Sequence, residues 1–305
     1  MAETLRIGII GFDTSHVPAF ARLLNDPMDP HHVPGGRVVA GYPSFSPDLE
    51  ASYSRVEGFK QEVTTKWGVE LVDSIEELLD RVDAVLLESV DGRRHLVEAR
   101  PVIEAGKPLY VDKPLAANYR EAAEIMRLAR EHGCPIFSSS SLRFDAHIVA
   151  IKEDEGLGAV LACDAFSPAT LNASNPGLFW YGVHGVELLY TFMGRGCERL
   201  RCTATPSYDV VVGHWPDGRL GTMRGTRAGA HEYGVTVFGE KKVAQALYCR
   251  EIPIYAQLLR EIMPFFRGER LPVDPQETLE IMAFMQAALL SAQEDREVTL
   301  EEARS

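Results

Sequence analysis

Several features that mark particular classes of protein are scarce in this sequence. Its five cysteines are scattered and never spaced as C-x-x-C, so nothing indicates a disulfide framework. No apolar run reaches the roughly 18 residues that a membrane span needs. The N-terminus enters a strand pattern directly, without a basic stretch followed by an apolar one. We therefore expect a cytoplasmic protein with reduced thiols and no membrane contact.

Positive charge is also scarce. The 305 residues include 31 Lys and Arg against 44 Asp and Glu, which gives a net charge of -13 at pH 7. Nucleic-acid binding needs clustered basic side chains to hold phosphates, so we expect no nucleic-acid partner. Apolar residues, in contrast, make up 46% of the chain, enough for a full core and more typical of two domains than one.

The first part of the chain alternates between two patterns. From Leu5 to about Ser141, short apolar runs rich in β-forming residues are separated by longer segments of helical period. This alternation predicts parallel βαβ units and hence an α/β fold with a Rossmann-type doubly wound sheet. Its strands are expected at residues 5–10, 37–40, 84–87, 109–111 and 135–138.

The second part of the chain predicts an α+β domain. Helices are expected near residues 145–155, around His184 and over 276–294, and strands near 159–166 and from 200 to 248, the latter run antiparallel. We place the dinucleotide-binding domain at residues 1–118 and the substrate-binding and oligomerisation domain at 119–305. Residues 119–141 are expected to complete the Rossmann sheet.

A turn from Gly11 to His16 joins the first strand to the first helix. Such a turn offers backbone N–H groups and a helix N-terminus to a pyrophosphate. Of the usual G-x-G-x-x-G pattern only Gly11 is present, and an ionised Asp13 would repel phosphate unless it turns away to bond the backbone or a sugar hydroxyl. Thr14 and Ser15 can donate to phosphate or cap the helix, Ser15 being the favoured N-cap, and the two readings are equally supported. His16 is expected either to lie on the surface or to contact a ligand.

The end of the second strand lacks the acid that usually binds the ribose hydroxyls. No acidic residue occurs there before Asp48, and Ser44 can donate to either a hydroxyl or a phosphate. NAD and NADP therefore both remain open as the cofactor.

One longer motif resembles a known family. The segment Val111-Asp112-Lys113-Pro114-Leu115, which follows Ala105-Gly106-Lys107-Pro108, is similar to the A-G-K-x-V-x-x-E-K-P-L motif of Gfo/Idh/MocA oxidoreductases, with Asp112 in place of Glu. A helix opening at His95, the segment Ser140–Phe144 in place of N-x-R-F, and Gly182-x-His184 occur in the same order as in that family. The resemblance covers nearly the whole chain.

The resemblance implies a fold and an activity. The family combines a Rossmann domain with a domain that has a large open, mostly antiparallel sheet, through which relatives form homodimers or homotetramers. It implies an NAD(P)-dependent oxidoreductase that acts on a sugar, a polyol or a related hydroxy compound. Lys113 matches the lysine that bonds the reacting hydroxyl, and His184 matches the usual acid/base; both residue types suit these tasks.

Other residues are candidates for contacts with the ligands. Trp180 stands where relatives have an aspartate, and Glu187 could orient His184. Arg143 could bind an anionic or polyhydroxy substrate or form an inter-domain ion pair. Glu88 adds a carboxylate near the expected nicotinamide. The candidate cofactor-binding residues are Gly11, Phe12, Asp13, Thr14, Ser15, Ser44, Ser89, His95, Asp112 and Lys113; those for substrate are Arg143, Trp180 and Glu187.

Two further possibilities remain open. No metal is expected to be required, since His31 and His32 fit a solvated loop, and His184 with Glu187 would need a further ligand such as His214 or His231. The degraded glycine turn, the missing acid and Trp180 also fit a relative that keeps the fold as a binding or regulatory protein. A lyase or hydrolase that holds its nicotinamide tightly is the other alternative.

Overall fold

The computed structural model describes residues 3–305 and separates into two compact units. The first comprises the chain up to Ala116 together with Glu121–Ser138 and Tyr255–Pro275; the second comprises Ala117–Arg120, Ser139–Ile254 and Gln276–Ser305. The segment Tyr255–Pro275 corrects the expected division, which placed it in the second domain. Its helix packs in the first unit because aromatic side chains, described below, anchor it there.

The first unit contains a doubly wound sheet with the strand order β3-β2-β1-β4-β5-β6. The neighbours β1–β2, β1–β4, β2–β3 and β4–β5 run parallel. Ile10 pairs with Leu87, and Leu87 pairs with Val111, so the carboxyl ends of β1, β4 and β5 are level. The strands are β1 (Leu5–Ile10), β2 (Gly36–Tyr42), β3 (Glu70–Leu71), β4 (Ala84–Leu87), β5 (Leu109–Asp112) and β6 (Ile136–Ser139).

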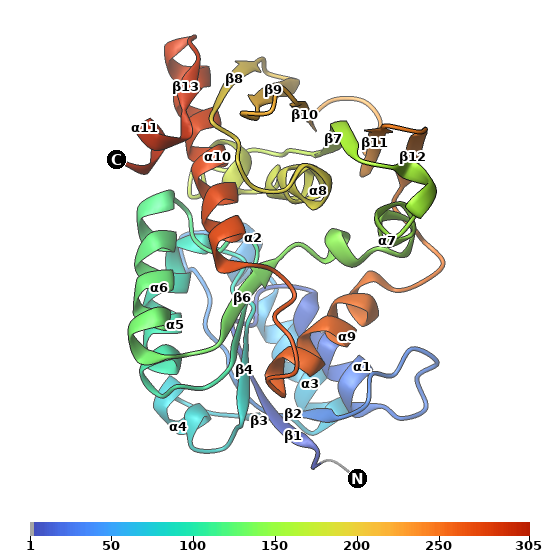
Figure 1. Ribbon diagram of the computed structural model, residues 1–305. Coiled ribbons are helices and arrows are strands. Elements are labelled where there is room, and N and C mark those ends of the chain that lie inside the picture. Colours follow the sequence, from blue (N-terminus) through green and yellow to red (C-terminus); the bar gives the residue numbers. More distant parts are fainter. Residues whose placement is uncertain (1–2) are drawn as a thin grey trace. The chain divides into compact units, whose positions relative to one another are not determined.

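Helices cover both faces of this sheet, with α4, α5 and α6 on one side and α1, α3 and α9 on the other (Figure 1). Gly68 ends α3 in a left-handed conformation. The expected start of a helix at His95 is wrong: α5 begins at Gly92, because the Asp91 side chain accepts a hydrogen bond from Arg93 N. The helices are α1 (His16–Asn25), α2 (Glu50–Tyr53), α3 (Val56–Trp67), α4 (Ile75–Leu79), α5 (Gly92–Glu104), α6 (Tyr119–His132) and α9 (Ile254–Phe266).

Helix α9 comes from the last third of the chain but completes the core of the first unit. Phe265 packs edge-on against Phe137, with ring centroids 4.7 Å apart. Near the other end of the helix, Tyr255 packs against His16 at 4.5 Å and against Phe20 at 5.7 Å. Burial of these aromatic rings is a large apolar contribution, which explains why the helix belongs to this unit.

The second unit contains the expected large, mostly antiparallel sheet. Its order is β12-β11-β7-β10-β9-β8-β13, and only β7 and β10 are found to pair in parallel among its described neighbours. The strands are β7 (Val160–Pro168), β8 (Arg199–Ala204), β9 (Tyr208–His214), β10 (Leu220–Thr226), β11 (Gly234–Gly239), β12 (Val243–Leu247) and β13 (Val298–Thr299).

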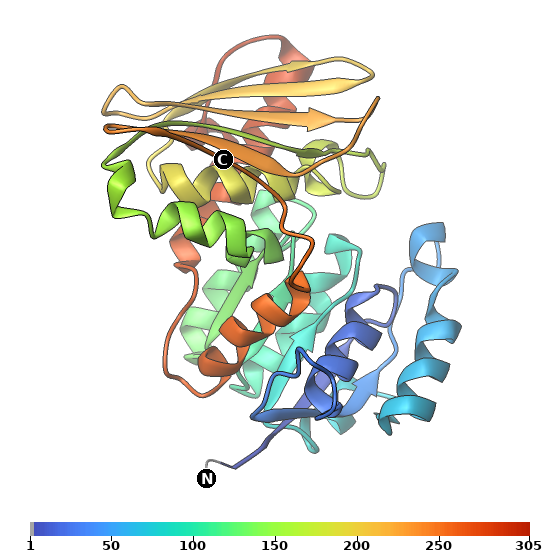
Figure 2. The same ribbon diagram turned by 90° about the vertical axis from the view of Figure 1, so that its right-hand side faces the viewer.

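Helix α8 covers one face of this sheet, as Figure 2 shows. The side chains of Val211, Met223 and Val237 are fully buried on that face. The helical segments of the unit are η1 (Ser141–Phe144), α7 (Ala146–Lys152), η2 (Glu155–Leu157), η3 (Gly177–Phe179), α8 (Val183–Met193), α10 (Pro275–Glu294) and α11 (Leu300–Arg304), where η denotes a 3-10 turn. Across residues 3–305, no helix combines the length and apolarity needed to cross a membrane.

Candidate active site

The glycine turn has the backbone that its first glycine requires. Gly11 adopts a φ of 85°, and a Cβ there would lie 2.3 Å from the backbone nitrogen of Ser89. Helix α1 then begins at His16 with Ser15 at the N-cap, as predicted, but no side chain caps the helix. In this first turn His16 N donates to Thr14 Oγ1 and Val17 N to the Thr14 carbonyl, and Pro18 has no N–H, so an anion would meet the helix dipole more than free backbone donors.

Asp13 is fully buried, and its hydrogen-bond partners are groups of the protein. Its carboxylate accepts hydrogen bonds from Ser52 Oγ at 2.6 Å and from Val90 N at 3.0 Å. Burial raises the pKa of Asp13, although both hydrogen bonds oppose the change. Asp13 therefore bonds the backbone, as expected, and its hydroxyl partner is a serine of the protein.

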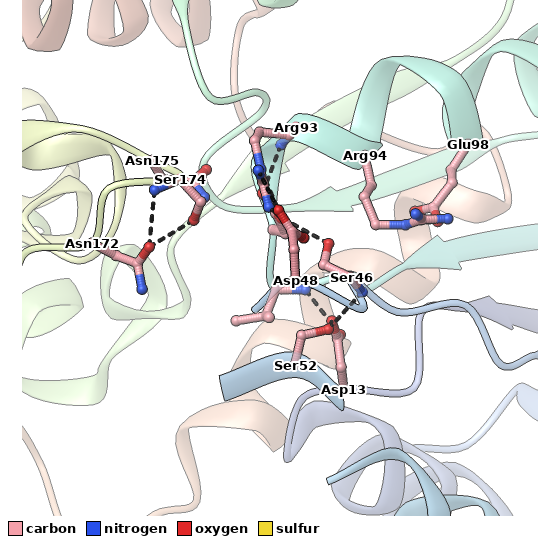
Figure 3. A network of polar contacts seen from close by, with 12 residues as sticks. Asp13, Ser46, Asp48, Ser52, Arg93, Arg94, Glu98, Asn172, Ser174 and Asn175 are labelled. Carbon is pink, nitrogen blue, oxygen red and sulfur yellow. Dashed lines mark hydrogen bonds and ion pairs between the residues drawn. The ribbon is translucent and has the colours of Figure 1, made fainter. Parts of the chain in front are cut away.

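The loops after β2 and β4 are joined by a second polar network (Figure 3). Ser46 Oγ donates to Asp91 Oδ2 at 2.7 Å, and Arg93 pairs with both Asp91 and Asp48. The hydrogen bond from Arg93 lowers the pKa of Asp48. Asp48, the first acid after β2, is therefore held by Arg93.

Three predicted cofactor residues take part in internal contacts. Ser44 Oγ lies 3.4 Å from Ser89 Oγ, which donates to Glu98 Oε2 at 2.5 Å. The ring of His95 is fully buried, with Nε2 2.7 Å from the carbonyl of Ser89 and Nδ1 3.0 Å from that of Pro114. His95 thus links the end of β4 to the turn after Lys113, and its contacts are to backbone carbonyls.

A buried cluster of four ionisable side chains lies at the level carboxyl ends of β1, β4 and β5. His16 Nδ1 is 2.8 Å from Glu88 Oε2 and 3.4 Å from Asp112 Oδ2. Lys113 Nζ is 3.7 Å from the same Asp112 oxygen, and its side chain is only 12% exposed. His16 is therefore not a surface residue, and the predicted catalytic lysine belongs to a charged network.

Mutual interactions shift the proton affinities in this cluster. Burial raises the pKa of Glu88 to about 7, against the opposing effect of its hydrogen bond to His16. Burial alone would lower the pKa of His16, but the carboxylates of Asp112 and Glu88 raise it above its usual value. Glu88 Oε1 is buried and has no hydrogen-bond partner. The pair His16–Glu88 can therefore hold a proton near neutral pH.

In the second unit, His184 lies in the first turn of α8. Its Nδ1 is 2.7 Å from Ser140 Oγ, and its ring packs edge-on against Tyr181 and Tyr233. The expectation that Glu187 orients His184 is wrong, because Ser140 is the partner. Ser140 stands in the segment that the motif comparison singled out, but spacing alone did not indicate this contact.

Glu187 instead forms a buried ion pair with Arg143. Arg143 Nη2 also lies 2.6 Å from Glu277 Oε1, and both Arg143 and Glu187 are buried. Burial raises the pKa of Glu187, and Arg143 opposes this shift. Arg143 thus forms ion pairs, but with residues of its own unit, so the expected inter-domain pairing is wrong. Trp180 is half-buried directly after η3.

Metal-type ligands gather in two places within residues 3–305. One group is His16, Glu88 and Asp112, and the other is His147, Cys249 and Glu251. His184 belongs to neither. The signal for the first group was present in the sequence: His16 occupies the third glycine position of G-x-G-x-x-G, where a large polar side chain needs a partner in the interior.

Parts of this chain are similar to known oxidoreductases. Residues 5–140 match the GFO_IDH_MocA family model, described as an oxidoreductase family with an NAD-binding Rossmann fold. Inositol 2-dehydrogenase from Cereibacter sphaeroides is 31% identical over 182 residues, which are 58% of this chain and 48% of that protein. The aligned part spans about half the length of the curated relatives.

Solved structures share the fold over nearly the whole chain. The apo scyllo-inositol dehydrogenase from Lactobacillus casei has a TM-score of 0.80 at 14% identity, covering 99% of this chain and 100% of that one. GenD2 from gentamicin A biosynthesis, in complex with NAD, has a TM-score of 0.78 at 18% identity, with 98% and 97% covered. At these identities the likeness concerns the fold.

Proposed function

Because residues 5–140 match the model of the Gfo/Idh/MocA oxidoreductase family, we propose that this chain belongs to the family and transfers hydride between a nicotinamide cofactor and a sugar, polyol or related hydroxy compound. The observation that carries the proposal is Lys113, whose largely buried ammonium group follows β5 and lies beside Asp112. Parallel α/β sheets bind their ligands at this edge. Cyclic polyols come first among substrates, since a relative is an inositol 2-dehydrogenase.

The glycine turn fits a dinucleotide in three respects. Gly11 allows the close approach to Ser89, and the start of α1 carries no side-chain cap. The carboxylate of Asp13 accepts hydrogen bonds from Ser52 and Val90, and these protein donors offset the negative charge that would repel phosphate. Thr14 and Ser15 are the remaining groups that would contact phosphate. The serine at residue 44 leaves NAD and NADP equally compatible.

Each proposed catalytic residue has a distinct task. A bound nicotinamide supplies the hydride acceptor. Lys113 donates a hydrogen bond to the reacting oxygen and stabilises the negative charge that develops on it, while Asp112 keeps the ammonium in place. The resemblance to the family makes His184 the candidate for accepting the hydroxyl proton; when its Nδ1–H donates to Ser140, the basic lone pair is on Nε2.

Cofactor binding is the first test. Titration with NADH and NADPH, followed by nicotinamide fluorescence and calorimetry, should give micromolar binding of at least one of them. Inositols and sugars are then screened for reduction of the matching oxidised cofactor. Absence of binding, together with no nicotinamide retained through purification, contradicts the proposal.

The role of Lys113 is tested on a substrate found in that screen. Lys113→Met should lower kcat by roughly 10²–10³-fold, the usual effect of losing one donor to a developing oxyanion. Lys66→Met, on an exposed part of α3, serves as the matched control and should retain full turnover. Unchanged kcat in Lys113→Met would remove the lysine from the mechanism.

A relative without dehydrogenase activity is the second candidate. Asp13, Ser46 and Arg93 join the loops that follow β1, β2 and β4, where a dinucleotide would lie. A binding protein of this kind would show no nicotinamide binding. A lyase or hydrolase would instead retain nicotinamide and turn over substrate without a net change in its absorbance.

We further propose that the chain forms a homodimer or homotetramer through the second sheet. The face opposite α8 bears exposed apolar side chains on β10 and β12: Leu220, Val243 and Leu247 are 44%, 58% and 54% exposed. Exposed apolar side chains on an uncovered sheet face favour association.

A further inference from the structure

The cluster at the edge of the first sheet combines three ligand atoms of the kinds that bind divalent metals. His16 Nδ1 and one carboxylate oxygen from each of Glu88 and Asp112 lie within 4.8 Å of one another. The residues are held by three different elements, the start of α1 and the ends of β4 and β5. The arrangement is therefore fixed by the sheet and does not depend on a flexible loop.

The two carboxylates of this cluster are incompletely compensated. Glu88 is fully buried, and its Oε1 makes no hydrogen bond. A buried carboxylate oxygen without a partner is costly, and a second carboxylate nearby adds repulsion. Lys113 approaches Asp112, but at 3.7 Å it makes no close hydrogen bond to it. The cluster thus offers both negative charge and an unused ligand atom to a cation.

We propose that His16, Glu88 and Asp112 form a binding site for a divalent transition-metal ion such as Zn²⁺ or Mn²⁺. Imidazole and carboxylate ligands together suit these ions better than Ca²⁺, which prefers oxygen alone. Ligand atoms around a tetrahedral zinc ion are roughly 3.3 Å apart. The observed separations from His16 Nδ1, 2.8 Å to Glu88 and 3.4 Å to Asp112, require only small movements to match.

The metal would change the charge at this edge of the sheet. Two carboxylates balance the divalent ion, so the ammonium group of Lys113 is left as net positive charge. This charge lies near His16 at the N-terminus of α1, where the helix dipole also favours anions. The site is therefore suited to place a metal ion next to an oxyanion or phosphate group.

The second group, His147, Cys249 and Glu251, is the natural comparison within the chain. The side chains of His147 and Glu251 are 51% and 78% exposed, so water competes with any metal there. It also contains a thiol, whereas the proposed site contains only nitrogen and oxygen ligands. A Co²⁺ ion distinguishes the two, since a thiolate ligand adds a strong ligand-to-metal charge-transfer band.

The experiment measures metal binding by the full chain without any nicotinamide or substrate. Zn²⁺, Mn²⁺ and Co²⁺ are titrated by calorimetry, and retained metal is counted by elemental analysis after dialysis. We expect about one equivalent in the wild type and in Glu251→Gln, and a loss of affinity of at least about tenfold in Glu88→Gln. The Co²⁺ spectrum should lack the thiolate band.

Several results would overturn the proposal. They are no retained metal in the wild type, equal affinity in Glu88→Gln, or a thiolate band that disappears in Glu251→Gln. Asp112→Asn is a second ligand variant in case Glu88→Gln does not fold, which circular dichroism checks. Because no readout involves hydride transfer, failure of this site and failure of the proposed activity are distinguishable.

Discussion

The carboxyl group of Asp13 is buried and accepts hydrogen bonds from Ser52 and Val90. Burial raises its pKa above the unfolded value near 3.9, so its contribution to stability is complete below about pH 4 and is lost as pH rises through the folded-state pKa. Asp13→Asn cannot titrate and keeps an acceptor for Val90 N. We expect this variant to gain stability relative to the wild type as pH rises from 4 to 8, measured by urea denaturation.

The matched control for this prediction is Asp73→Asn, an exposed aspartate outside the network. Its stability should follow the wild type across the same pH range. A constant difference between Asp13→Asn and the wild type at every pH would show that the Asp13 carboxyl does not titrate in this range.

The sequence predicted which residues of the site were unusual, but not their partners. Asp13 and Lys113 were identified from motifs. Their neighbours were not, because Ser52 lies 39 residues from Asp13 and Glu88 lies 72 residues from His16. For Glu187 a partner was predicted, but it was the wrong one. Helical spacing suggested His184, whereas the structure pairs Glu187 with the guanidinium group of Arg143, 44 residues away in sequence.

Among elements, those with a clear period were predicted well. The expected strand at 84–87 coincides with β4, and α10 begins and ends within one residue of the prediction. Helix α9 was not predicted, and its place in the first unit could not be read from its sequence. Its attachment depends on Phe137 and His16, which are far away along the chain.

Two glycines, Gly58 within α3 and Gly68 at its C-terminal end, test the backbone conformation of this helix. Gly58 is exposed within the helix and a Cβ there meets nothing, so Gly58→Ala should raise the free energy of unfolding by about 0.5–1 kcal/mol. Gly68 ends the helix with a φ of 65°, so Gly68→Ala should lower it by about 1–2 kcal/mol. Chemical denaturation of both variants measures the difference.

The two glycine variants control for each other, since each adds one methyl group to an open position. Stabilisation of the protein by Gly68→Ala would contradict the left-handed cap. Destabilisation by Gly58→Ala would contradict a regular helix at that residue.

At the scale of the whole molecule, the uncovered sheet face is the main candidate for self-association. Val212 and Phe238 are on this face, because their strand neighbours Val211 and Val237 are buried on the opposite one. The double variant Val212→Glu and Phe238→Glu should shift the protein from oligomer to monomer in sedimentation or light scattering. Charge buried in an interface without a partner is strongly unfavourable.

Val97→Glu provides the control, because Val97 is 72% exposed on α5 of the first unit. It should leave the oligomeric state unchanged. A monomeric wild type, or an oligomer that survives the double variant, would exclude this face as the interface.

The late position of α9 along the chain has a consequence for biosynthesis. The first six strands leave the ribosome more than a hundred residues before Tyr255 and Phe265, which cover His16 and Phe137. Until then α1 and α3 cover this face of the nascent sheet only in part, and Phe137 lacks its contact with Phe265. The first unit can therefore reach its final packing only after the segment Ser139–Ile254 of the second has been synthesised, and a chain truncated after β6 would expose a surface prone to aggregation.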